Sequence, residues 1–292
     1  MSFAADWLAL REPYDLAARN RDVLAAVAAA FADRAAPTVV DLACGTGSTL
    51  RALGSHLPAH QIWRLVDNDL GLLARAAQSA APAGASVIAV PIDLARDLEA
   101  ALDGAVDLVT ASALLDLVSA DWLERFVVEA AARRLPVYAA LSYDGRATLE
   151  PADPFDAAIV AAVNRHQRRD KGFGPALGPT AAAAASVQFA KVQYTLVQGS
   201  SDWVLGPDDR EMQQEVLSGW AAAARELNEL APAAIIDWLA RRRDFVAGGR
   251  SAVRVGHVDV FAIPTGTRPA ERSQSNSISS PSAWVRTGGR SA

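Results

Sequence analysis

The chain has 292 residues, of which 51% are hydrophobic, enough to bury a core in one large domain or in two at most. Its formal net charge of −5 argues against a nucleic-acid partner bound through a broad basic face. No signal pattern opens the chain and no apolar run approaches ~18 residues, so we expect a cytoplasmic protein without a membrane partner.

The first 36 residues are predicted to form a helical cap. Their apolar residues recur at helix-like spacing, and Pro13 is expected to break the pattern; these residues are Leu16, Leu24, Val27 and Phe31. The segment 10–15 interrupts the pattern with charged residues and an aromatic side chain, Tyr14.

A glycine-rich turn follows the first predicted strand. An apolar run ends in Asp41, Gly45 and Gly47 come next, and a helical pattern then starts at Leu50. This order predicts a strand leading into a nucleotide-binding turn, because glycine allows unusual φ values and close approach of a ligand. A dinucleotide site would need a small residue where Leu50 stands, which disfavours NAD. The only cysteine, Cys44, lies in this turn and excludes an internal disulfide, a cysteine-based zinc site and a cysteine-ligated iron–sulfur cluster; we expect it to be a small packed residue and expect no metal site.

Two further strands are predicted to end in acids. Asp67 follows the apolar run 62–66, and Asp93 follows the run 86–91. An acid about 20 residues past the glycines can accept both ribose hydroxyls of an adenosine, whether in a dinucleotide or in a methyl donor. Asp41, Asp67 and Asp93 are spaced by 26 and 26 residues, as successive βα units would place them at one edge of a sheet. Acids that cap helices would explain each one singly, but not their combination with the glycine turn.

Together these motifs resemble the class I S-adenosylmethionine-dependent methyltransferases, whose first motif runs acid-x-Gly-x-Gly-x-Gly. Ala43 stands in the place of the first glycine, and the resemblance covers roughly residues 37–263. It implies an α/β fold with a doubly wound, seven-stranded, mostly parallel sheet and an antiparallel last strand. It also implies a helical cap over residues 1–36 and a methyltransferase domain over 37–264, with a helical insertion at about 151–187 before the sixth strand.

The same resemblance implies that S-adenosylmethionine is the cofactor. Tyr14 or Arg19 of the cap would face the methionine carboxylate, although a solvated helix with one packed tyrosine explains the segment equally well. The implied cofactor-binding residues are Asp41, Ala43, Gly45, Gly47, Asp67, Asn68, Asp93, Leu94, Ser112, Tyr14 and Arg19.

A fourth strand is predicted to begin at Asp107. In the resembled family, the loop that follows this strand faces the methyl acceptor. Asp116 lies in this loop and is either an acceptor-site residue or a solvated acid. Asp121 is predicted to cap the next helix, with Glu124 completing a capping box. The loop lacks an Asn/Asp-Pro-Pro-Tyr/Phe motif, which disfavours methylation of base or glutamine amino groups by that route.

A polar loop is predicted to lie over the site after the fifth strand, 135–144. A helix beginning at Asp153-Pro154 runs into this loop, which carries basic residues, glycines and His166. The predicted catalytic residues are His166, Asp116 and Tyr143, and the predicted substrate-binding residues are Asn164 and Lys171. The alternative is a charged helix end complementing the helix dipole, followed by a glycine stop.

The last part of the chain should complete the sheet. A sixth strand is predicted at 191–198, two helices follow, and the last strand at 251–263 should carry a bulge at Gly256. The basic run 241–243 is predicted to be a solvated helix face. Residues 265–292 have the composition of a disordered tail, and deleting 268–292 should leave folding and cofactor binding intact.

The sequence therefore predicts a methyltransferase acting on a small molecule by in-line transfer. An RNA or protein methyltransferase is one alternative, and a non-catalytic cofactor-binding protein of the same fold is another.

Overall fold

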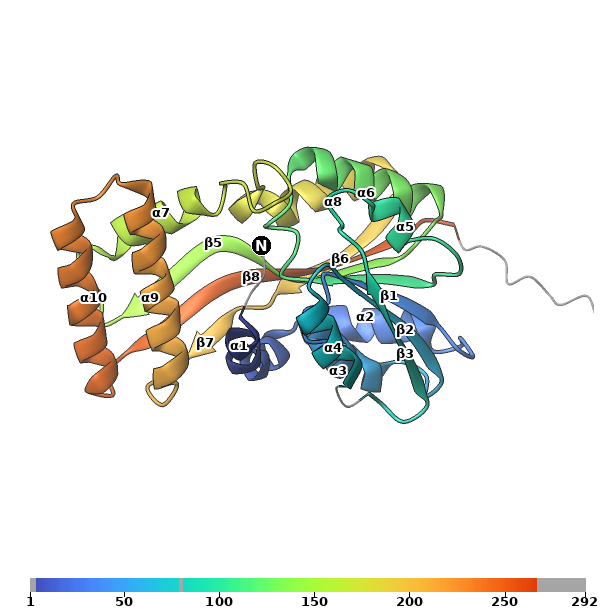
Figure 1. Cartoon of the computed structure of the whole chain (residues 1–292), viewed down its shortest axis with the longest axis horizontal. Coiled ribbons are helices and arrows are strands. Elements are labelled where there is room, and N and C mark those ends of the chain that lie inside the picture. The colour runs from blue at the N-terminus through green and yellow to red at the C-terminus, as the bar shows by residue number, and fades with distance from the viewer. Residues whose placement is uncertain (1–3, 79–80, 267–292) are drawn as a thin grey trace, which may run out of the picture.

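A computed structural model describes residues 4–78 and 81–266, so most of the predicted tail lies outside the described residues. An eight-stranded sheet organises the chain, in the order β3-β2-β1-β4-β5-β8-β6, with β7 paired to β8 (Figure 1). The mostly parallel α/β architecture confirms the predicted fold class. The predicted count of seven strands is wrong by one, because the short strand β7 (Trp203–Leu205) adds to the sheet.

The parallel half of the sheet brings the strand-end acids together. It comprises β1 (Thr38–Leu42), β2 (Gln61–Asp67), β3 (Ala85–Pro91), β4 (Leu108–Ser112) and the first part of β5 (Val137–Glu150). Their pairing is parallel throughout, so their carboxyl ends meet at one edge. Every residue of β1 is buried, as expected for a strand covered on both faces.

Helices cover both faces of this sheet (Figure 1). Alternate strand residues enter two hydrophobic clusters, one with Val40 and Val109, the other with Val39 and Leu108. The first cluster is completed by α5 (Leu98–Ala101), α6 (Ala120–Ala132) and α8 (Ala181–Lys191). The second is completed by α2 (Arg21–Phe31), α3 (Ser48–Leu53) and α4 (Leu70–Gln78).

The long strands β5 and β8 (Ala252–Pro264) run past this sheet into a third hydrophobic cluster. There they are joined by β7 and covered by α7 (Asp156–His166), α9 (Arg210–Leu227) and α10 (Pro232–Ala247), at the left of Figure 1. We call these three helices, β7 and the parts of β5 and β8 beneath them the distal lobe. The helix α1 (Ala5–Ala18) lies between the distal lobe and the parallel sheet. In the described part of the chain, no helix is long and apolar enough to cross a bilayer.

Several predicted helix boundaries are wrong. Pro13 lies inside α1, and the chain breaks instead at Asn20, whose side chain caps α2. Ser119, not Asp121, caps α6 by accepting the backbone N–H of Trp122 at 3.2 Å. The predicted sixth strand starts too early, since 181–191 forms α8 and β6 covers Tyr194–Ser200.

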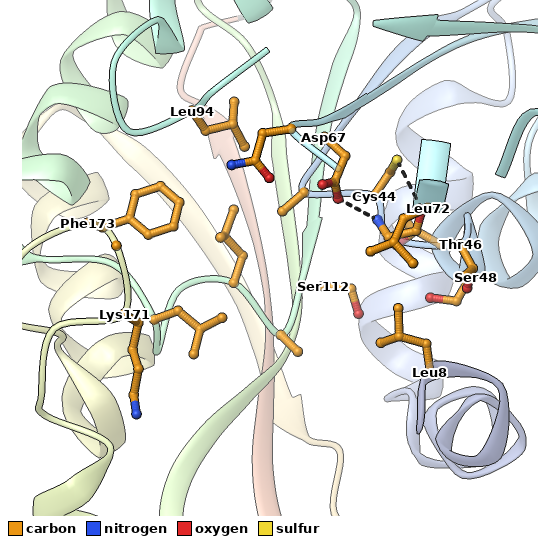
Figure 2. Close-up of a pocket in the computed structure, with 18 of the residues that line it drawn as sticks. Leu8, Cys44, Thr46, Ser48, Asp67, Leu72, Leu94, Ser112, Lys171 and Phe173 are labelled. Carbon is orange, nitrogen blue, oxygen red and sulfur yellow. Dashed lines mark hydrogen bonds between the residues drawn. The ribbon is translucent and has the colours of Figure 1, made fainter. Parts of the chain in front are cut away.

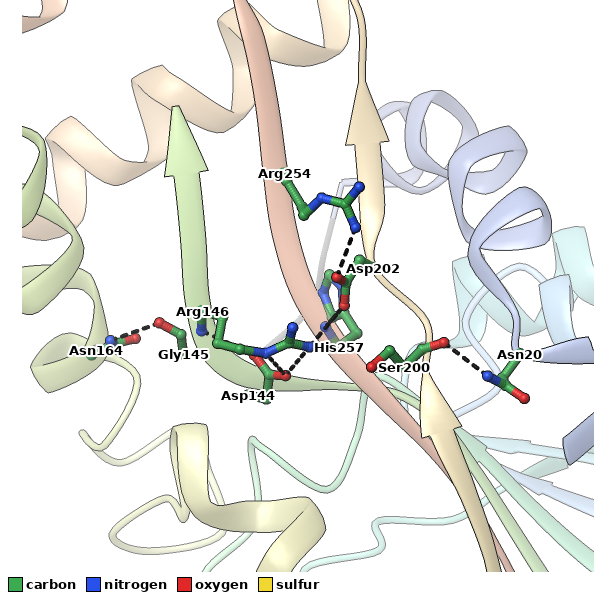
Figure 3. Close-up of polar contacts among 9 residues, drawn as sticks. All are labelled: Asn20, Asp144, Gly145, Arg146, Asn164, Ser200, Asp202, Arg254 and His257. Atoms are coloured by element: carbon green, nitrogen blue, oxygen red, sulfur yellow. Dashed lines mark hydrogen bonds and ion pairs between the residues drawn. The ribbon is translucent and has the colours of Figure 1, made fainter. Parts of the chain in front are cut away.

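The predicted bulge at Gly256 lies on the opposite strand. Tyr143 and Ala147 of β5 face His257 and Val255 of β8, so the extra residues belong to β5. A Cβ on Gly256 would collide with the carboxylate of Asp144. Glycine is therefore required here because the Asp144 side chain lies so close to the backbone of β8. Figure 3 shows Arg146 between the carboxylates of Asp144 and Asp202.

The solvated face predicted for 241–243 is also wrong at its centre. Arg242 is fully buried, pairs with Asp156 of α7 and donates to the carbonyl of Pro151 at 2.7 Å. Arg241 pairs with Asp153 at 2.6 Å, while Arg243 is exposed. Arg242 therefore joins α10 to α7, and Arg241 joins α10 to the segment just before α7.

Candidate active site

The glycine turn has the backbone conformation that its sequence predicts. Gly45 and Gly47 have φ values of 55° and 82°. Ala43 also has a positive φ of 51°, a conformation that glycine would adopt without a steric cost. Cys44 between them is buried, and burial raises the pKa of its thiol, in keeping with a packed residue.

Asp67 lies against this turn at the end of β2. Its carboxylate accepts the backbone N–H of Gly45 at 2.9 Å and that of Asp69 at 3.0 Å. A carboxylate can accept about four hydrogen bonds, so Asp67 keeps lone pairs for a ligand.

A cleft runs along the carboxyl ends of the parallel strands and encloses about 1130 Å³, part of it open to solvent. The glycine turn forms one wall, and Figure 2 shows Phe173 and Lys171 across the cleft from it. Seven of the predicted cofactor residues line the cleft: Ala43, Gly45, Asp67, Asn68, Asp93, Leu94 and Ser112.

Asp41 and Gly47 are not among the lining residues. Asp41 is fully buried beneath the turn and accepts the hydroxyl hydrogen of Thr110 at 2.7 Å. Burial raises the pKa of Asp41 to about 7, against the opposing effects of the Thr110 hydrogen bond and the Arg19 charge. Its second oxygen has no hydrogen-bond partner among residues 4–78 and 81–266.

The cap reaches the cleft through a different face from the one predicted. Tyr14 donates to Asp209 at 2.9 Å, and Arg19 contacts the hydroxyls of Tyr138 and Ser112 at 3.2 and 3.3 Å. Neither Tyr14 nor Arg19 lines the cleft. Instead α1 presents Leu8, Arg11 and Asp15, whose spacing of three and four residues places them on one helix face. The sequence itself shows this spacing, and it could have predicted that these three residues face the cleft.

Of the predicted acceptor-side residues, Lys171 alone lines the cleft. Its Nζ lies 3.3 Å from Nδ1 of His166, whose Nε2 lies 2.9 Å from the carboxylate of Glu226. Desolvation lowers the pKa of Lys171. The hydroxyl of Tyr143 donates to Asn164 at 2.7 Å, and burial raises the pKa of this tyrosine.

Asp116 is buried near this group without lining the cleft. One of its carboxylate oxygens finds no hydrogen-bond partner in the described part of the chain, and burial raises the pKa of Asp116 to about 6. The charges of Arg11 and Lys171 oppose that rise.

Known proteins match this chain in part. Residues 39–136 match a family model described as a methyltransferase domain. No curated protein sequence matches the chain.

Solved methyltransferase structures share the fold at low identity. A methyltransferase from Thiobacillus denitrificans, solved with S-adenosylhomocysteine, is 14% identical and covers 90% of this chain and 100% of its own, with a TM-score of 0.43. A cyclopropane-fatty-acyl-phospholipid synthase-like protein from Lactobacillus casei is 14% identical, covers 87% and 99%, and scores 0.46. A cyclopropane synthase from Mycobacterium tuberculosis is 13% identical, covers 82% of both chains and scores 0.43. Values this low assign no substrate.

The matched segment contains the glycine turn and the acids at the ends of β2 and β3 that line the cleft. Residues 39–136 therefore form a class I S-adenosylmethionine-dependent methyltransferase domain.

Proposed function

We propose that the protein transfers the methyl group of S-adenosylmethionine to a small molecule held between α1 and residues 171–173. The observation that carries this proposal is the cleft itself, which continues from the glycine turn to Lys171 and Phe173. The cofactor would occupy the part beside the turn, and the acceptor the part beyond it.

The lining residues fit this cofactor. Asp67 has free lone pairs for ribose hydroxyls, and Asp93 with Leu94 would lie beside the adenine. A Cβ on Gly45 would lie 3.3 Å from Leu8 Cδ1, so α1 packs closely on the turn that would hold the cofactor.

The acceptor end suits a compact molecule with an apolar body and a polar group. Leu114, Leu117 and Phe173 give it apolar surface, while Arg11 and Lys171 supply charged groups. Two segments of the chain itself, α1 and the loop that follows α7, bound this end. The formal net charge of −5 gives no support to a nucleic-acid substrate.

S-adenosylmethionine supplies a methyl group on a positively charged sulfur. The task of the protein side chains is to align the acceptor with that group and to exclude water, since transfer is an in-line displacement. Leu8 from α1 and Phe173 from the opposite wall are placed to do this.

Methyl-labelled S-adenosylmethionine tests the proposal when it is supplied with fractionated small metabolites and, separately, with RNA and protein. Label in a small-molecule fraction supports it. Label in RNA or protein would reassign the substrate class, and cofactor binding with no transfer to any fraction would indicate a non-catalytic protein.

A further inference from the structure

The side chain of Lys171 stands out among the basic groups of this chain. The chain has 28 lysine and arginine residues, and only Lys171 and Lys191 are lysines. Lys171 lines the cleft and is 8% exposed, whereas Lys191 is exposed. An arginine stays protonated at every physiological pH, but a lysine in a desolvated site can lose its proton. The cleft thus carries a basic side chain that, unlike arginine, can lose its proton and act as a base.

Within the described residues, Lys171 has no carboxylate close enough to stabilise its ammonium form by an ion pair. Glu226 of α9 and Asp116 after β4 act on it only at longer range, where they oppose the lowering of its pKa by desolvation, and Arg169 of its own loop adds to that lowering. Among the described residues, its hydrogen-bond partner is His166 of α7.

The direction of the hydrogen bond between Lys171 and His166 can be assigned from their neighbours. An ammonium group can only donate and the Glu226 carboxylate can only accept. Nδ1 of His166 must therefore accept from Lys171, while Nε2–H donates to Glu226, if both contacts are hydrogen bonds. The side chain of Glu226 is 61% exposed, so this chain of contacts leads from the cleft to solvent.

We propose that Lys171, as a neutral amine, accepts the proton of a hydroxyl or amine acceptor during methyl transfer, and that His166 and Glu226 pass this proton to solvent. The proposal rests on the proposed function and names its acceptor class. The acceptor oxygen or nitrogen forms its bond to the methyl carbon as the carbon–sulfur bond breaks, and the electron pair of that bond stays on sulfur. The acceptor proton moves to Nζ, then to Nδ1 of His166, while the Nε2 proton leaves through Glu226.

The protonation of Lys171 can be measured without knowing the acceptor. The two lysines are labelled by reductive methylation with ¹³C-formaldehyde and titrated by NMR in the full chain bound to S-adenosylhomocysteine, with Lys171→Arg and Lys191→Arg assigning the signals. Lys171 should lose its proton at a lower pH than the exposed reference Lys191, because desolvation disfavours its ammonium form. Titration of the two amines together would overturn the proposal.

Coupling through the relay gives a second measurement. Glu226→Gln should lower further the pH at which Lys171 loses its proton, because the carboxylate favours the ammonium form. Glu229→Gln is the matched control, since Glu229 pairs with Arg165 instead. Long-range ¹H–¹⁵N spectra should show His166 as the Nε2–H tautomer, and the Nδ1–H tautomer would contradict the relay.

Rate measurements distinguish a Lys171 that acts as a base from a Lys171 that only binds an anion through its charge. With a labelled small-molecule fraction, Lys171→Arg should lose about 10²–10⁴-fold in rate, as Lys171→Ala does, while Lys191→Arg keeps full rate. Full activity of Lys171→Arg would overturn the base role and leave the proposed function standing. Absence of transfer by the unmodified protein would contradict the proposed function, and the titration would still decide the protonation of Lys171.

Discussion

The carboxylate of Asp67 already holds the glycine turn through two backbone N–H groups. If its remaining lone pairs bind the ribose, Asp67→Ala should weaken binding of S-adenosylhomocysteine by about 1.5–3 kcal/mol for each lost hydrogen bond. Isothermal titration measures this change. Asp67→Asn keeps one acceptor oxygen and should bind with intermediate affinity, whereas the exposed Asp33→Ala should bind like the unmodified protein. An unchanged dissociation constant in Asp67→Ala would reject the ribose role.

Asp41 should make the stability of the protein depend on pH. Burial raises its pKa from 3.8 to about 7, so the folded state binds more protons than the unfolded state between these values. The free energy of unfolding should therefore fall as pH rises through this range, and Asp116, with a pKa of about 6, should add to the fall.

Asp41→Asn tests the source of this dependence. The amide resembles the neutral acid and cannot ionise, so urea unfolding of the variant should lose less stability between pH 4 and pH 7. An identical pH dependence in the variant and the unmodified protein would show that Asp41 is not responsible.

For single residues, the sequence predicted where a side chain lies in the fold better than which other side chains it contacts. The acids at the ends of β2 and β3 were found because a strand end fixes where a residue lies. Asp41 was placed at the right edge, but its contact with Thr110 depends on a strand 69 residues away. The family resemblance implies Tyr14 or Arg19 at the cofactor, whereas helix periodicity from Leu8 would instead indicate Arg11 and Asp15.

Among the elements, α10 is fixed to α7 by a buried ion pair. Removing one partner of such a pair leaves a charge without compensation, so Arg242→Ala should destabilise the protein by about 3–5 kcal/mol. Arg243→Ala, at an exposed position bonded to Ser218, should change stability by about 0.5 kcal/mol or less. Urea denaturation measures the free energy of unfolding of both variants. Equal losses would show that the ion pair of Arg242 with Asp156 does not stabilise the protein more than the exposed Arg243 does.

The burial of Arg242 could have been predicted from helix periodicity. Ile235, Trp238, Leu239 and Val246 are buried on the same face of α10, and position 242 falls among them. The run of three arginines concealed this pattern. By contrast, no periodicity indicates the extra residues in β5, because a bulge depends on its partner strand.

Across the whole molecule, α1 connects the glycine turn with the distal lobe. Glu12 pairs with Arg51 of α3, while Asp15 accepts from Trp203 of β7 at 2.9 Å. Binding of S-adenosylhomocysteine should therefore slow amide hydrogen exchange in α1 and in residues 167–178. Exchange in α10 is the internal control, since α10 does not line the cleft. Protection confined to the glycine turn would show that α1 does not close over the ligand.

The strands β5 and β8 also determine how the molecule comes apart. Residues of β5 enter all three hydrophobic clusters, Ala139 the first, Tyr138 the second and Leu149 the third, and residues of β8 do the same. A lobe that shares its central strands with the neighbouring sheet cannot melt while that sheet stays intact. We expect one cooperative unfolding transition in urea, with the fluorescence of Trp238 in the distal lobe and of Trp63 in the parallel sheet changing together. Separate midpoints, measured in variants that each keep one of these tryptophans, would instead reveal two units of independent stability.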